Sequence, residues 1–228
     1  MKYQVILFDA DGTLFDYDYA EAYGLESTFQ HFKLLYIKEK HLSSYRTINN
    51  ALWKDLEAGR ITSSKLRIER FETLFNETNS ELDYLEFSQV YLTFLSQATM
   101  MIDGAYEICQ YLSQRYKLVI VTNGMREVQI PRIQHSRLKG YIEHIVISED
   151  AGYQKPDPRF FDYASRIIGQ ELKDHAIIIG DSLSSDILGG SNYGLPTCWY
   201  NPARSVNRTG IVPDFEINHL LELKTFFK

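Results

Sequence analysis

Cysteine, proline and long apolar runs are all scarce in this chain of 228 residues. The two cysteines, Cys109 and Cys198, lie far apart and match no metal-ligand or redox spacing, so we expect two reduced thiols in the core. The first apolar run, residues 5–8, is short and is broken by Asp9, which argues against a signal peptide and against a membrane span. We therefore expect a cytoplasmic protein with no membrane partner.

Positive charge is also in short supply, with 24 lysines and arginines against 30 aspartates and glutamates and a net charge of -6. This balance gives no general attraction to nucleic acid or anionic lipid, so we expect no nucleic-acid partner. Any anionic substrate must be met by positive groups placed locally. With 44% hydrophobic and 24% charged residues, the chain otherwise has the composition of a globular protein with a sizeable core.

The pattern of apolar residues differs between two parts of the chain. Over residues 17–98 apolar residues recur at three- and four-residue spacing, which is typical of helices. Elsewhere helical segments alternate with short apolar runs, which are "VILF", "KLVIVTNG", "HIVISE", "AIIIGDS", "PTCWYN" and "DFEIN". Such alternation predicts an α/β fold, with a doubly wound Rossmann-like parallel sheet in residues 1–16 and 99–228. An all-helical cap domain, residues 17–98, is inserted after the first strand.

Two aspartates follow the first strand directly, in the stretch "VILFDADGTLFD". In an extended chain residues i and i+2 point the same way, so Asp9 and Asp11 are expected to converge on one object. Open α/β sheets bind their ligands at this carboxyl end of the strands. Two carboxylates ~4 Å apart repel by about 4 kcal/mol at an effective dielectric near 20, so a counter-charge is expected there.

Later strands also end in polar residues that would reach the same crevice. Thr122 and Asn123 follow the strand "LVIV" and form a turn that suits an oxyanion. Asp181 ends the strand "AIIIG", and Asp186 lies five residues further on. Between these strands, Lys155 precedes two prolines that stiffen the chain before a helix.

The charge at this crevice would be strongly negative. Four carboxylates together with a bound phosphate dianion cannot be balanced by one lysine. A hard divalent cation would balance them, and magnesium is the usual ion held by one or two carboxylates together with substrate phosphate. The residues therefore predict a Mg²⁺ site and chemistry on phosphate.

These stretches together resemble the haloacid dehalogenase-like phosphohydrolase superfamily. Its four motifs occur in order, as "DADGT", "TNG", "KPDP" and "GDSLSSD", and the helical insertion matches the superfamily's small cap class. Within it, "NALWKDLEAGRITSSKLRIERFETLF" and "GDSLSSDILGGSNYGLPTCWYNP" are similar to the pyrimidine-type 5'-nucleotidase branch. The resemblance implies a magnesium-dependent phosphomonoesterase whose small-molecule substrate is a nucleoside monophosphate.

The resemblance also implies roles for the acidic residues. Asp9 would attack phosphorus to give an aspartyl-phosphate, and Asp11 would protonate the leaving oxygen and then deprotonate the attacking water. The metal would bind Asp9, the backbone carbonyl of Asp11, and Asp181. Asp186 would act through a water or through Lys155.

Three residues would hold the phosphoryl oxygens by the same resemblance: Thr122, the backbone of Asn123, and Lys155. One departure from the pattern is Asp103 in "MIDGA", where relatives often have proline. We expect Asp103 to cap the helix that follows, without a part in the chemistry.

Other activities share these motifs. Phosphatases of phosphoglycolate or sugar phosphates have the same core motifs, and a phosphomutase would use Asp9 and Asp11 but return the phosphate to its substrate. A dehalogenase lacks the second acid of the first motif, so Asp11 argues against that activity. The sequence leaves open the preferred base and sugar, the cap residues that contact substrate, and the oligomeric state.

Overall fold

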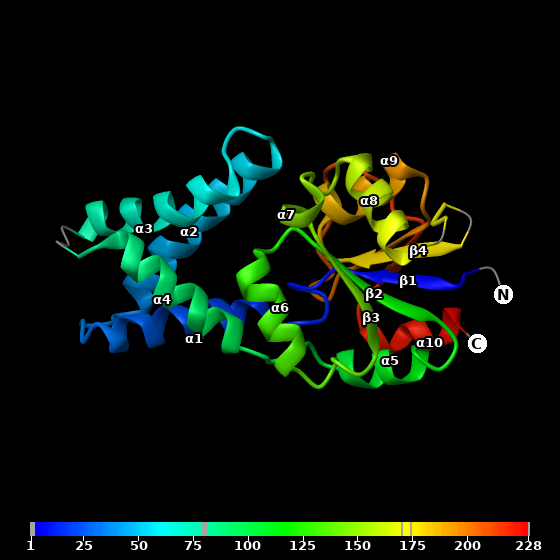
Figure 1. The fold of residues 1–228 in the computed structure, drawn as a ribbon, viewed down its shortest axis with the longest axis horizontal. Helices are drawn as coiled ribbons and strands as arrows, with labels where there is room; N and C mark the ends of the chain where they lie inside the picture. Colours follow the sequence, from blue (N-terminus) through cyan, green and yellow to red (C-terminus); the bar gives the residue numbers. More distant parts are fainter. Residues whose placement is uncertain (1–2, 79–81, 170, 174, 228) are drawn as a thin grey trace. The chain divides into compact units, whose positions relative to one another are not determined.

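A computed structural model describes residues 3–78, 82–169, 171–173 and 175–227 of the chain. The chain divides into two compact units. The first comprises residues 1–17, 99–126 and 133–228, and the second comprises residues 18–98 and 127–132. Figure 1 shows both units.

The first unit is built on a six-stranded parallel sheet. Its strands are β1 (Val5–Phe8), β2 (Lys117–Thr122), β3 (Ile142–Ile147), β4 (Ala176–Gly180), β5 (Thr197–Tyr200) and β6 (Phe215–Ile217). They lie in the order β3-β2-β1-β4-β5-β6, so the direction of winding reverses beside β1. This order confirms the predicted doubly wound Rossmann-like core, and ligands of such sheets bind outside the carboxyl ends of the strands at the reversal point.

Apolar side chains fill both faces of this sheet, which is why its strands are continuous apolar runs. Ile6 and Phe8 of β1 belong to one buried cluster, whereas Val5 and Leu7 belong to another, because successive side chains of a strand point to opposite faces. Helices α5 (Ala105–Leu112) and α10 (Leu223–Phe226) cover the first face, and α8 (Pro158–Ile168) and α9 (Leu188–Tyr193) cover the second (Figure 1). Short segments complete the unit: α7 (Ser148–Ala151), η1 (Leu183–Ile187) and η2 (Leu220–Glu222).

The second unit contains helices joined by short loops, and no strand occurs among its described residues. Its helices are α1 (Tyr17–His31), α2 (Lys38–Glu57), α3 (Ser63–Thr78) and α4 (Tyr84–Gln97), joined by residues 127–132 of α6 (Arg126–His135). Stacked and tilted aromatic rings fill the space between α2, α3 and α4, among them Tyr45, Phe71 and Tyr91. The packing of these rings accounts for the apolar spacing seen in the sequence.

Two local expectations have different outcomes. Cys109 and Cys198 are both free and buried, as expected of core thiols. The expectation that Asp103 caps α5 is wrong, because the cap residue is Gly104, whose left-handed backbone (φ 80°) starts the helix one position later. Asp103 instead pairs with Nε2 of His219 at 3.1 Å. In the described part of the chain, no helix combines the length and the hydropathy needed to span a membrane.

Candidate active site

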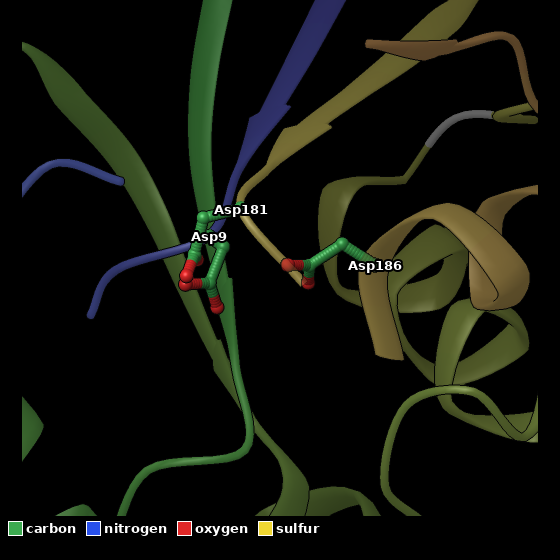
Figure 2. A group of neighbouring side chains, drawn as sticks. All are labelled: Asp9, Asp181 and Asp186. Atoms are coloured by element: carbon green, nitrogen blue, oxygen red, sulfur yellow. The ribbon is translucent and has the colours of Figure 1, made fainter. Parts of the chain in front are cut away.

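Three aspartates from different elements converge at the carboxyl edge of the sheet, as Figure 2 shows. Asp9 directly follows β1, Asp181 directly follows β4, and Asp186 lies in η1. One carboxylate oxygen from each lies within 4.8 Å of the other two. Since β1 and β4 are neighbours in the sheet, the fold itself brings the first two carboxylates together. Asp9 and Asp181, which are 172 positions apart in the sequence, therefore belong to one acidic site.

Lys155 lies against this acidic site and is almost fully buried, with 1% of its surface exposed. Its Nζ donates to Asp9 Oδ1 at 2.6 Å, to Asp186 Oδ1 at 2.6 Å, and to the carbonyl of Val121 at 2.8 Å. Burial by itself would lower the pKa of Lys155, but the charges of Asp186 and Asp9 raise it above its ordinary value. The ammonium therefore stays charged and bridges two of the three carboxylates.

The carboxylates outnumber this one cation. Burial raises the pKa of Asp9 well above its ordinary value, although Lys155 opposes the shift. Loss of water and the nearby charge of Asp186 raise the pKa of Asp181 to about 7. Burial is the larger cause of both shifts, and the charge of Asp186 adds to each. Three carboxylate oxygens grouped in this way are a donor set that fits a hard divalent cation.

The loop after β1 closes tightly around Asp181. Gly12 has φ +83°, and a Cβ built there would lie 2.6 Å from Asp181 Oδ2, so a side chain at this position would displace the carboxylate. Thr13 donates from its hydroxyl to Asp181 Oδ1 at 3.1 Å. The "GT" of the first motif therefore shapes the space beside the second aspartate. The sequence alone predicts no role for Thr13, because its partner lies 168 positions away.

The side chain of Asn123 makes a contact that the sequence does not predict. Its side-chain Nδ2 donates to the carbonyl of Lys155, and its Oδ1 accepts from the Lys155 backbone N–H, both at 2.9 Å. The adjacent Thr122, which is 1% exposed, accepts from Gly124 N through its hydroxyl oxygen at 2.9 Å. The turn after β2 thus fixes the backbone that carries the buried lysine.

Seven residues are predicted from the sequence to take part in the active site, and the structure brings most of them together. Asp9, Lys155, Asp181 and Asp186 form the acidic site, and Thr122 and Asn123 lie at the end of β2 beside it in the sheet. Asp11 is partly buried in the loop after β1, whose backbone Gly12 N donates to Phe15 O at 2.9 Å. The side chain of Asp11 is not one of the three grouped carboxylates among the described residues.

The fold and the acidic site place the chain among α/β enzymes with a Rossmann-like core. Residues 6–200 match the model of the haloacid dehalogenase-like hydrolase family. The chain belongs to this family, which confirms the resemblance carried by the four motifs.

Three relatives are similar to this chain over nearly its whole length. YfnB of Bacillus subtilis, named a HAD-hydrolase, is 38% identical over 222 residues, which cover 97% of this chain and 94% of YfnB. A crystal structure of YfnB bound to magnesium has a TM-score of 0.92 and 37% identity, and each chain is covered completely. The pyrimidine 5'-nucleotidase PynA of Streptococcus pneumoniae is 36% identical over 218 residues, covering 95% of this chain and 92% of PynA.

The pyrimidine 5'-nucleotidase YjjG of Escherichia coli is 34% identical over 224 residues, covering 98% of this chain and 97% of YjjG. The likeness to PynA and YjjG matches the nucleotidase branch indicated by the cap sequence. Together with the family match, these relatives support classification of the chain as a phosphoric monoester hydrolase.

Proposed function

We propose that this protein is a magnesium-dependent 5'-nucleotidase that releases phosphate from pyrimidine nucleoside monophosphates. The observation that carries the proposal is the match to two pyrimidine 5'-nucleotidases over 95% and 98% of the chain, the helical unit included. The acidic site supports it, because phosphate-ester hydrolysis needs a nucleophile, a proton donor and positive charge near the phosphate oxygens.

Magnesium would be held by the carboxylates of Asp9 and Asp181 and by the backbone carbonyl of Asp11. The grouping of carboxylate oxygens and the excess of negative charge both support such a site, and YfnB has been crystallised with this ion. When bound, the ion would neutralise phosphate charge and orient the ester. Asp186 would act through Lys155, whose Nζ it contacts at 2.6 Å.

Asp9 would be the nucleophile. Lys155 holds its Oδ1 at 2.6 Å and thereby orients the carboxylate. Attack forms a bond from Asp9 to phosphorus and breaks the bond from phosphorus to the nucleoside oxygen, which takes a proton from Asp11. Asp11 then removes a proton from water as the water attacks phosphorus. Inorganic phosphate leaves, and the Asp9 carboxylate is restored.

The remaining polar groups would hold the phosphoryl oxygens while this happens. Thr122 offers its hydroxyl, Asn123 its backbone N–H, and Lys155 its ammonium. All three come from the ends of β2 and the loop before α8, which the side chain of Asn123 joins. A single well-placed donor of this kind is typically worth ~10²–10³-fold in turnover.

Phosphate release from a panel of monoesters tests the proposal. With Mg²⁺, UMP, CMP and dUMP should be hydrolysed with higher kcat/KM than AMP, GMP, phosphoglycolate and glucose 6-phosphate. With excess chelator, release should stop and should return when Mg²⁺ is restored. A clear preference for phosphoglycolate or a sugar phosphate would contradict the substrate class. Transfer of phosphate to a second sugar hydroxyl, with little release to water, would identify a phosphomutase.

A further inference from the structure

Trp199 of β5 contacts the turn that carries Asp181. Its indole Nε1 donates to the backbone carbonyl of Asp181 at 2.8 Å. We propose that Trp199 is a positioning residue, which sets the backbone of Asp181 so that its carboxylate is placed for magnesium. The inference rests on the metal site proposed above and adds a residue that makes no contact with the metal itself.

The sheet register explains why this contact falls on the turn. Gly180, the last residue of β4, is the pairing partner of Trp199 on β5. Asp181 is the next residue, so it lies just beyond the last paired position of the strand. A side chain reaching along the sheet from β5 is therefore well placed to hold the chain where the strand pairing stops. The two residues are only 18 positions apart, but no sequence pattern near either residue predicts the contact.

The burial of Trp199 explains why its indole N–H needs an acceptor from the protein. Trp199 is 6% exposed, and an indole N–H is a donor that can only be satisfied by an acceptor. In a buried position that acceptor must come from the protein, and the Asp181 carbonyl supplies it. Breaking this bond would leave both groups to find other partners, which would shift the turn.

The surroundings of Asp181 leave little room for such a shift. Thr13 holds Oδ1 at 3.1 Å, and Gly12 leaves just enough space for Oδ2, since a Cβ there would come within 2.6 Å. On the strand side, a Cβ at Gly180 would collide with the side chain of Asp186. A small movement of the Asp181 backbone would therefore misplace its carboxylate. Magnesium demands near-ideal octahedral geometry, so its affinity is sensitive to such displacements.

Direct measurement of Mg²⁺ binding, without substrate, tests the inference. We compare wild type, Trp199→Phe and Trp53→Phe by titration calorimetry, because Trp53 is the only other tryptophan and lies in the helical unit. Loss of an outer-shell hydrogen bond typically weakens metal binding ~10–100-fold, and we expect about tenfold for Trp199→Phe. Trp53→Phe should bind like wild type. At saturating Mg²⁺ the KM for UMP should stay unchanged in Trp199→Phe.

A second comparison separates the N–H from the packing of the ring. In Trp53→Phe protein Trp199 is the sole tryptophan, so it can be replaced site-specifically by 3-benzothienylalanine, which has sulfur in place of the N–H. The same loss of affinity in this protein supports the inference, even where Trp199→Phe does not fold. Unchanged Mg²⁺ affinity in a folded benzothienylalanine protein would overturn the inference and leave the proposed function intact. Wild type that binds no Mg²⁺ would overturn the metal site and the inference together.

Discussion

Asn123 and Lys155 hold each other through two hydrogen bonds between a side-chain amide and a backbone peptide, both 2.9 Å long. The pair joins the turn after β2 to the loop before α8, across 32 positions of sequence. It fixes the backbone of Lys155, and the Nζ of that lysine in turn bridges Asp9 and Asp186. The placement of the buried ammonium thus depends on an amide that is hydrogen-bonded to the backbone of Lys155 and not to the three carboxylates.

Asn123→Ala should therefore impair turnover through Lys155. The substitution removes both bonds and leaves two backbone groups of the loop without their partner, which typically costs ~1–3 kcal/mol for each unsatisfied group. We expect kcat for UMP to fall by about tenfold or more. Asn192→Ala is the matched control. Asn192 is exposed, and its side chain donates to the carbonyl of Pro156, the residue after Lys155, over a long distance of 3.4 Å, so little should be lost with it. A normal kcat in folded Asn123→Ala protein would refute the positioning role.

Lys155→Met should destabilise the metal-free protein in a pH-dependent way. Removing one partner of a buried ion pair typically costs ~3–5 kcal/mol, because the remaining charges are buried without compensation. The carboxylates left behind escape that cost by taking up protons, so the loss should be smaller near pH 5 than near pH 8. Urea unfolding at both pH values measures it.

Lys117→Met is the control for that experiment. Lys117 pairs with Glu143 at 3.2 Å, but both side chains are more than 40% exposed, so its loss should cost less than about 1 kcal/mol at either pH. Equal losses for the buried and the exposed lysine would contradict the electrostatic account of the site.

Magnesium affinity should rise with pH across the neutral range. In the metal-free protein the pKa of Asp181 is raised to about 7 and that of Asp9 lies well above its ordinary value. Below about pH 7 a divalent ion must displace protons from these carboxylates, and above it they are increasingly ionised beforehand. Calorimetry in two buffers of different ionisation enthalpy should detect proton release at about pH 6 and much less at about pH 8.5. Affinity and proton release that do not change with pH would show that these groups are not the ligands.

Asp11→Asn should slow catalysis in proportion to the leaving group's need for a proton. General acid–base assistance is typically worth ~10²–10⁴-fold, and a nucleoside alkoxide needs it far more than a nitrophenolate. The ratio of wild-type to variant phosphorylation rates in single turnovers should therefore be larger for UMP than for p-nitrophenyl phosphate. Equal ratios for the two substrates would remove Asp11 from the role of proton donor.

The core strands and the acidic site could be predicted because their signals are local. Residues 5–8 form an apolar run that predicts a buried strand. Asp9 and Asp11, which follow it, predict a functional site at the carboxyl end of that strand. The parallel sheet then brings strand ends together, so Asp9 and Asp181 could be expected to meet. These inferences need only periodicity and the topology of a doubly wound fold.

The contacts that place these groups could not be predicted in the same way. The bonds from Thr13 to Asp181, from Asn123 to Lys155 and from Trp199 to Asp181 join residues whose side chains give no local sign of a partner. Asp103 failed as a cap because the backbone of Gly104 decided where α5 begins. Each outcome depends on packing between distant segments, which a single sequence does not display.

Trapping of a covalent intermediate tests the central claim most directly, namely that Asp9 attacks phosphorus. Wild-type protein and Asp9→Asn are mixed with limiting UMP that carries a radiolabelled phosphate, in the presence of Mg²⁺, and quenched in acid within one turnover. The account predicts label bound to wild-type protein, mapped by peptide analysis to Asp9, and neither bound label nor released phosphate from folded Asp9→Asn. Phosphate release from Asp9→Asn at the wild-type rate, or label on another residue, would contradict it.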